Sequence, residues 1–221
     1  MGLKKEESKF KKKFKKFWFL LWEDDSFKGW LFSLIFLFVF IKFIFFPALN
    51  FVTGTTLPLA IVESCSMYHE GNFFSDFNSW FLRHEIKYGN LNITGEQFEH
   101  FEIRRGFSKG DIVFIIKANP DKLKIGDIIA FNSGTRNTPI IHRIINIQKD
   151  KDGKIFTTMG DNNAKSLIPT NNAGAIDERE IRENQLVGKA VIRLVPWFGW
   201  IKLVFFEGFR PEAERGFCNE N

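Results

Sequence analysis

The chain has 221 residues, 44% of them hydrophobic, and a formal net charge of +5. This length accommodates one medium-sized domain and a short additional segment. Much of the lysine excess lies in the first seventeen residues, which indicates a membrane-surface and topology signal and argues against a nucleic-acid-binding surface. Many of the 28 phenylalanines lie before residue 52, so we expect two different environments. Cys65 and Cys218 could form a bridge, but they lie far apart in different segments and do not support a disulfide framework.

Residues 1–28 form a basic segment in which Phe10, Phe14 and Phe17 recur at intervals of four and three. This spacing predicts a helix with one apolar face among lysines. Such a helix can lie on an anionic membrane surface. A solvated, partly disordered tail is the equally weighted alternative.

Residues 29–49 are long and apolar enough for a transmembrane helix. Lys42 lies near the far end of the run, where its ammonium group can reach the interface. A cleaved signal peptide is the weaker alternative, because the apolar run and the polar leader are both too long. Lysines crowd before this run and none follows until after Arg83. We therefore expect a cytoplasmic N-terminus and a single-pass protein of the cell membrane.

Residues 50–195 are expected to form an extracytoplasmic, mainly β domain, a coiled antiparallel sheet resembling a barrel. Aromatic residues at helical spacing predict an amphipathic helical insertion over residues 72–101, and Thr94-Gly95-Glu96-Gln97 has the form of a capping box. The last segment, residues 196–221, begins with an apolar run too short to span comfortably, and its two tryptophans favour a membrane-interfacial position. A second short span is the alternative. The expected strands cover residues 59–64, 110–116, 126–131, 140–148, 154–160 and 186–194.

A candidate nucleophile, Ser66, follows the first expected strand. Serine is a poor nucleophile without an adjacent base. Of the four histidines, only His142 lies in a strand-like run; the others, His69, His84 and His100, have no matching partner in the sequence. Ser66 and His142 are therefore the hypothesised nucleophile and base.

The third group of this hypothesis is Asp161. If Asp152 and Gly153 form a two-residue hairpin turn, Lys151 pairs with Lys154, and Asp161 becomes the diagonal neighbour of His142 on the same face. A register slip of one residue would send the two side chains to opposite faces. The turn and the proposed chemistry thus depend on each other.

Four short boxes in this order, behind an apolar helix, resemble type I signal peptidases of the archaeal and endoplasmic-reticulum type. That family reads Ser-x-Ser-Met, Gly-Asp-Ile/Val-x-x-Phe, His-Arg and Gly-Asp-Asn-Asn. Together the resemblance covers roughly residues 54–200. The matching positions here are residues 64–67, 126–131, 142–143 and 160–163.

The resemblance implies a membrane-bound serine endopeptidase, a hydrolase that removes signal peptides from exported preproteins in protein secretion. Ser66 would attack the scissile carbonyl, His142 would accept its proton, and Asp161 would support His142. Ser64 and Met67 are expected at the oxyanion and substrate-binding positions. The substrate would have small side chains one and three positions before the cut and bind as an added strand.

Three departures from the family pattern stand out. Cys65 replaces the commoner glycine and Tyr68-His69 replaces the usual residue and proline. Family members often carry a second aspartate about six residues after the first, where this chain has Leu167. Asp177 is the candidate substitute, and a single aspartate that suffices alone is the alternative.

The main alternative is a catalytically inactive, membrane-anchored β-domain that binds exported peptides or partner proteins, which Leu167 favours. A metal site is disfavoured, because the histidines are scattered and the cysteines lack ligand spacing. We therefore expect no metal and no cofactor. The expected partners are signal-peptide-bearing preproteins, the lipid bilayer and the secretion translocon, with no nucleic acid.

Overall fold

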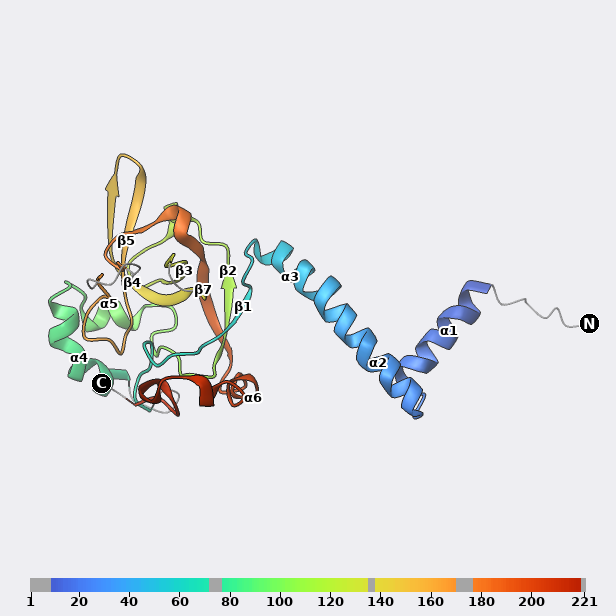
Figure 1. Ribbon diagram of the computed structural model, residues 1–221. Coiled ribbons are helices and arrows are strands. Elements are labelled where there is room, and N and C mark those ends of the chain that lie inside the picture. The colour runs from blue at the N-terminus through green and yellow to red at the C-terminus, as the bar shows by residue number, and fades with distance from the viewer. Residues whose placement is uncertain (1–8, 72–76, 135–137, 170–176, 220–221) are drawn as a thin grey trace, which may run out of the picture. The chain divides into compact units, whose positions relative to one another are not determined.

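The computed structural model describes residues 9–71, 77–134, 138–169 and 177–219. Figure 1 shows the helices and strands along the chain. The chain separates into two compact units, Met1–Val52 and Thr53–Asn221, and each is described by itself.

The first unit is helical. The basic helix α1 (Lys9–Trp22) is followed by α2 (Phe27–Phe40), whose N-terminus is capped by the Ser26 side chain. The rings of Phe32 and Phe36 on α2 pack edge-on against Phe17 of α1. The two helices therefore form a hairpin.

A continuous helical run over Phe27–Thr53 is long and apolar enough to cross a membrane. It contains α2, a π-helical turn (Ile41–Phe45) and α3 (Phe46–Thr53). The π turn has a physical cause, because Pro47 lacks an amide hydrogen and its ring would clash with a carbonyl one turn earlier. Widening the preceding turn, where the Phe46 N–H bonds to the Ile41 carbonyl, relieves that clash without ending the helix.

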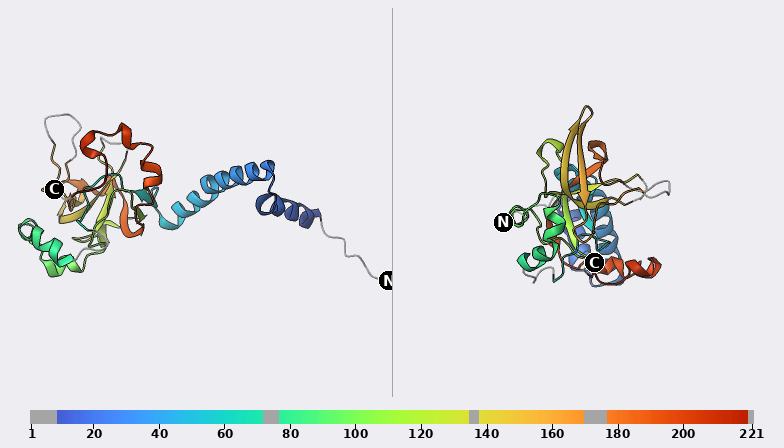
Figure 2. Two further views of the ribbon diagram at one scale, coloured as in Figure 1. Left: turned by 90° about the horizontal axis from the view of Figure 1, so that it is seen from below. Right: turned by 90° about the vertical axis from the view of Figure 1, so that its left-hand side faces the viewer.

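The second unit is a curled, seven-stranded antiparallel sheet with strand order β1-β2-β7-β3-β4-β5-β6. This confirms the predicted mainly β class. The longest hairpin, β4–β5, projects beyond the rest of the sheet in Figures 1 and 2. The strands are β1 (Leu59–Ile61), β2 (Ile112–Ile116), β3 (Ile128–Phe131), β4 (Ile140–Asp150), β5 (Gly153–Met159), β6 (Ile181–Arg182) and β7 (Leu186–Val195).

The register of the β4–β5 hairpin differs from the expected one. Asp150 pairs with Gly153, so Lys151 and Asp152 form the turn. Farther along, the register shifts between Ile144 and Asn146, and Arg143 pairs with Met159. This β-bulge inserts one extra residue into β4 and changes which side chains share a face beyond it.

Two helices, α4 (Phe77–Gly89) and α5 (Gly95–Glu99), form the insertion between β1 and β2. The buried Phe98 ring contacts the rings of Trp80 and Tyr88, so the aromatic face of the insertion packs into a core. The capping box at Thr94 is also confirmed. Phe73 and Phe74, which belong to the predicted stripe, lie outside the described residues.

The C-terminal segment contains the short helix α6 (Trp200–Leu203) and two 3₁₀ turns, Glu207–Phe209 and Glu212–Glu214. Two further 3₁₀ turns, Pro120–Lys122 and Glu183–Gln185, lie within the sheet region. Within the described ranges, no second helix is long enough to span a membrane. The C-terminal segment exposes many large apolar side chains instead: Trp197, Phe198, Ile201, Val204, Phe205, Phe206, Phe209 and Phe217.

Candidate active site

Ser66 lies in a turn just after the edge strand β1. The neighbouring Met67 is buried in the sheet core and fixes the turn from below. From the opposite side, the Asn162 amide donates to the Ser66 carbonyl at 2.8 Å. A Cβ at Gly160 would stand 2.6 Å from that carbonyl oxygen, so only glycine permits this close approach. The serine is thus held between the core and the turn at residues 160–163.

The structure brings Ser66 and His142 together, although 76 residues separate them. The Ser66 Oγ lies 2.8 Å from His142 Nε2. His142 is buried, and its Nδ1 is hydrogen-bonded to the Glu178 carboxylate. Because an ionised carboxylate only accepts, Nδ1 carries the hydrogen and Nε2 is left to accept the Ser66 proton. This is the tautomer that a general base for serine needs.

Glu178 was not among the predicted site residues. Its carboxylate is completely buried and is held in place by two further donors, the Thr158 hydroxyl at 3.0 Å and the Leu167 amide at 2.7 Å. Leu167 occupies the place where the resembled family often has a second aspartate. Leu167 has no carboxylate to offer at this position. Glu178, eleven residues later in the chain, supplies one there instead.

Asp161, the predicted third group, does not contact His142. Its carboxylate accepts from Arg143 Nε at 2.9 Å and Nη2 at 2.6 Å, from His69 Nε2 at 2.9 Å and from the Tyr88 hydroxyl at 3.1 Å. The prediction of an Asp161–His142 pair is wrong because the bulge in β4 places Asp161 on the side of Arg143. The same contacts give His69 the partner that the sequence did not reveal.

The charges in this buried cluster reinforce one another. Burial alone would raise the pKa of Asp161, but the Arg143 guanidinium and the His69 hydrogen bond hold it well below its usual range. Burial also lowers the pKa of Arg143, and the Asp161 charge more than restores it. Burial raises the pKa of Tyr88 well above 10.0. The cluster is built around the buried ion pair of Asp161 and Arg143, and through Tyr88 it joins α4 to the turn at residues 160–163.

The alternative acidic residue, Asp177, lies next to Glu178 and points away from the site. It forms a two-point ion pair with Arg179, with contacts of 2.8 and 2.6 Å. This pairing lowers the Asp177 pKa from its ordinary value. Among the described residues, Asp177 forms no hydrogen bond or ion pair with His142.

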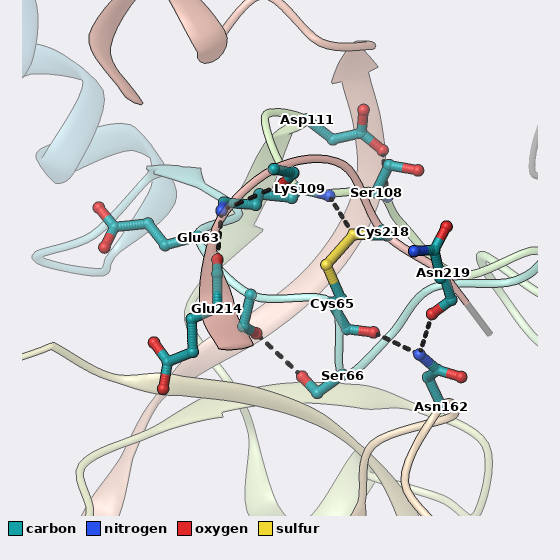
Figure 3. Close-up of a disulfide and its surroundings, with 12 residues drawn as sticks. Glu63, Cys65, Ser66, Ser108, Lys109, Asp111, Asn162, Glu214, Cys218 and Asn219 are labelled. Atoms are coloured by element: carbon teal, nitrogen blue, oxygen red, sulfur yellow. Dashed lines mark hydrogen bonds between the residues drawn. A yellow bond between two sulfur atoms is a disulfide. The ribbon is translucent and has the colours of Figure 1, made fainter. Parts of the chain in front are cut away.

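Cys65 and Cys218 form a disulfide, with their Cα atoms 5.3 Å apart (Figure 3). The bridge that the sequence left open is therefore present, despite the large sequence separation that argued against it. The C-terminal segment folds back across 153 residues of sequence to reach Cys65. The bond also excludes a Cys65 thiol as nucleophile, which leaves Ser66 in that position.

A groove of about 630 Å³ runs past Ser66 and His142. Its walls come from β1, from the start of β4 and from the C-terminal segment. Ser64 contributes its hydroxyl, which lies 3.1 Å from Ser66 Oγ. Among the described residues, no set of three His, Cys, Asp or Glu side chains is arranged to hold a metal ion. The apolar lining includes Leu57, Leu59, Ile61, Met67, Ile140 and Ile141.

We expect the folding stability of this unit to depend on pH through the protonation of His69. Burial lowers the His69 pKa below its ordinary 6.5, so the unfolded chain binds a proton more readily than the folded one. Stability should therefore fall as the pH drops below 6.5, by up to about 1.4 kcal/mol per pH unit. Urea unfolding across this range should show a smaller slope for His69→Gln, whose amide still reaches Asp161. The exposed His100→Gln serves as control and should keep the wild-type slope. An unchanged slope in His69→Gln would contradict this assignment.

No protein-family model matches the chain. It is 29% identical over 101 residues to the human signal peptidase complex catalytic subunit SEC11C, an overlap of 44% of this chain and 50% of the relative. It is 31% identical over 104 residues to the SEC11 subunit of Scheffersomyces stipitis, covering 46% and 58% of the two chains. For SEC11 of Zygosaccharomyces rouxii the identity is 31% over 98 residues, covering 44% and 56%. The chain thus spans about half the length of the curated relatives it matches and is similar to catalytic subunits of signal peptidase complexes.

Proposed function

We propose that this protein is a membrane-anchored serine endopeptidase that removes N-terminal signal peptides from exported preproteins. The observation that carries the proposal is the continuous hydrogen-bonded series Ser66–His142–Glu178 at the edge of a groove. The similarity to signal peptidase catalytic subunits supports the same reaction and substrate class.

The proposed chemistry is acyl transfer. Ser66 Oγ attacks the scissile carbonyl carbon while His142 Nε2 takes the hydroxyl proton, and Glu178 stabilises the resulting imidazolium. The negative oxygen of the tetrahedral intermediate would accept hydrogen bonds from the Ser66 amide and the Ser64 hydroxyl. No acceptor for the Ser66 amide is found among the described residues, so that donor is available. His142 then protonates the leaving amine, and water repeats the cycle on the acyl-enzyme.

The substrate would enter as an added strand along the free edge of β1. This strand pairs with β2 on one side only, so its other edge has unpaired amide groups facing the groove. Met67 and the apolar lining would form the walls around small side chains one and three positions before the cut. The groove thus provides both backbone pairing and side-chain selection.

The membrane arrangement belongs to the same proposal. The apolar helix over Phe27–Thr53 would anchor the chain, with the lysine-rich α1 on the cytoplasmic side and the peptidase unit outside. The exposed aromatic side chains of residues 196–221 would lie in the membrane interface. Since the similar proteins are named as subunits of a complex, partner subunits and the secretion translocon are the proposed associates.

Cleavage of a model preprotein by the full chain in liposomes tests the function. Ser66→Ala and His142→Ala should each lower the rate by at least about 10³-fold, because nucleophile and base act as a unit. Ser79→Ala on the exposed face of α4 and His100→Ala are matched controls and should cleave like wild type. A chelator should leave the rate unchanged. If wild type binds the preprotein without cutting it, the inactive peptide-binding alternative replaces this proposal.

A further inference from the structure

The part of the C-terminal segment that follows α6, residues 204–219, returns to the nucleophile turn and is fixed there. Besides the Cys65–Cys218 disulfide, the Asn162 side chain donates to the Cys65 carbonyl at 3.1 Å and to the Asn219 carbonyl at 3.0 Å (Figure 3). Asn162 also binds the Ser66 carbonyl through its own amide. Asn162 therefore holds both the C-terminal segment and the turn that carries Ser66.

A buried lysine fixes the middle of the same segment. The Lys109 ammonium binds the Glu207 carboxylate, the Glu214 carbonyl at 2.7 Å and the Gly216 carbonyl at 3.3 Å. Its side chain is 1% exposed. A buried ammonium surrounded by three oxygens makes displacement of the segment costly. The segment is thus a fixed wall of the groove.

Arg210 is the side chain of this wall that meets the chain just after β1, at Glu63. Its Nη2 lies 2.8 Å from a Glu63 carboxylate oxygen, and its Nη1 donates to the Glu63 backbone carbonyl at 3.1 Å. Val62 directs both its amide and its carbonyl toward β2, to Asp111 and Gly110. Backbone groups alternate along a strand, so the Glu63 carbonyl faces the opposite, groove-lining edge. Arg210 therefore occupies the last acceptor of the edge that an added peptide strand would use.

We propose that Arg210 ends the pairing edge of β1 and thereby sets the register of the peptide that is presented to Ser66. This inference rests on the proposed peptidase function. Without the guanidinium, the Glu63 carbonyl can accept from one further peptide amide, and the substrate strand can shift along β1. A shift of one residue would turn every side chain to the wrong face, whereas a shift of two preserves the faces. Loss of Arg210 should thus produce a second cut two residues from the original one.

Mass spectrometry of the mature product after cleavage in liposomes tests this inference. In Arg210→Ala the product displaced by two residues should rise roughly tenfold or more relative to wild type, as expected for loss of a charged hydrogen bond. Arg210→Lys keeps the charge but lacks the forked donor, so it should show a smaller rise. Cys218→Ser keeps Arg210 on a loosened segment and should also show the displaced product in smaller amount. Arg83→Ala, which removes an exposed arginine paired with Glu70 outside the groove, is the control and should cut at one bond.

The outcomes separate this inference from the function on which it rests. If wild type cuts in a Ser66-dependent way and folded Arg210→Ala cuts more slowly at the same single bond, the peptidase proposal stands and the role of Arg210 is overturned. If wild type does not cut, both are overturned. Thermal melting of each variant verifies that the products come from folded protein.

Discussion

Glu178→Gln is expected to lower kcat by about 10³- to 10⁴-fold while KM changes little, by analogy with loss of the carboxylate in other serine triads. The glutamine side chain has nearly the same shape, and its remaining oxygen can still accept from the Leu167 amide. Its NH2 group then replaces the oxygen that Thr158 and His142 contact. It lacks the charge that stabilises a His142 imidazolium, and its amide group favours the wrong tautomer. The effect therefore falls on the chemical step. Steady-state kinetics on a preprotein or its peptide separates kcat from KM.

Asp177→Asn is the matched control for this prediction. It changes the neighbouring residue, whose carboxylate pairs with Arg179 at the surface, and should alter kcat by less than about threefold. A positioning role also predicts that the pH dependence of kcat changes in Glu178→Gln, which a purely structural role would leave alone. If Glu178→Gln retains wild-type kcat and pH profile, the acid that supports His142 lies elsewhere.

The sheet could be predicted from local patterns, and the Ser66–His142 pair followed from the one histidine that lies in a strand-like run. Strand alternation and turn residues place β2, β3, β4, β5 and β7 within a few residues of their positions. The bulge at the middle of β4 has no comparable signal, since it reflects packing between strands and the helical insertion. One inserted residue sufficed to move Asp161 from the expected partner, His142, to Arg143.

Glu178 escaped prediction, and the disulfide stayed an open possibility, for a related reason. Glu178 reaches the site because the chain returns along Thr158 after a long connection, and no spacing rule states which of two adjacent acids will point inward. Cys65 and Cys218 are brought together by tertiary contacts of Lys109 and Asn162 with the C-terminal segment. The clue in the sequence was indirect. The missing carboxylate at Leu167 pointed to a substitute from elsewhere in the chain, with a single aspartate as the other possibility.

Asp161→Asn is expected to destabilise the folded unit by about 3–5 kcal/mol, because it leaves Arg143 buried without its counter-charge. For a unit of this size the melting temperature should fall by roughly 6–20 °C. Calorimetry or urea unfolding measures the change. The exposed ion pair between Asp150 and Arg182 provides the control, since Asp150→Asn should cost less than about 1 kcal/mol.

A double variant tests whether the instability of Asp161→Asn comes from the unpaired charge of Arg143. Replacing Arg143 by methionine in the Asp161→Asn background removes the unpaired cation and should recover part of the lost stability. At temperatures where Asp161→Asn is still folded, its kcat should fall far less than that of Glu178→Gln. The opposite pattern, with wild-type melting and abolished turnover in Asp161→Asn, would assign the chemical role to Asp161 and leave Glu178 as a packing residue. The two carboxylates are thus distinguished by what fails first: the fold for Asp161 and the proton transfer for Glu178.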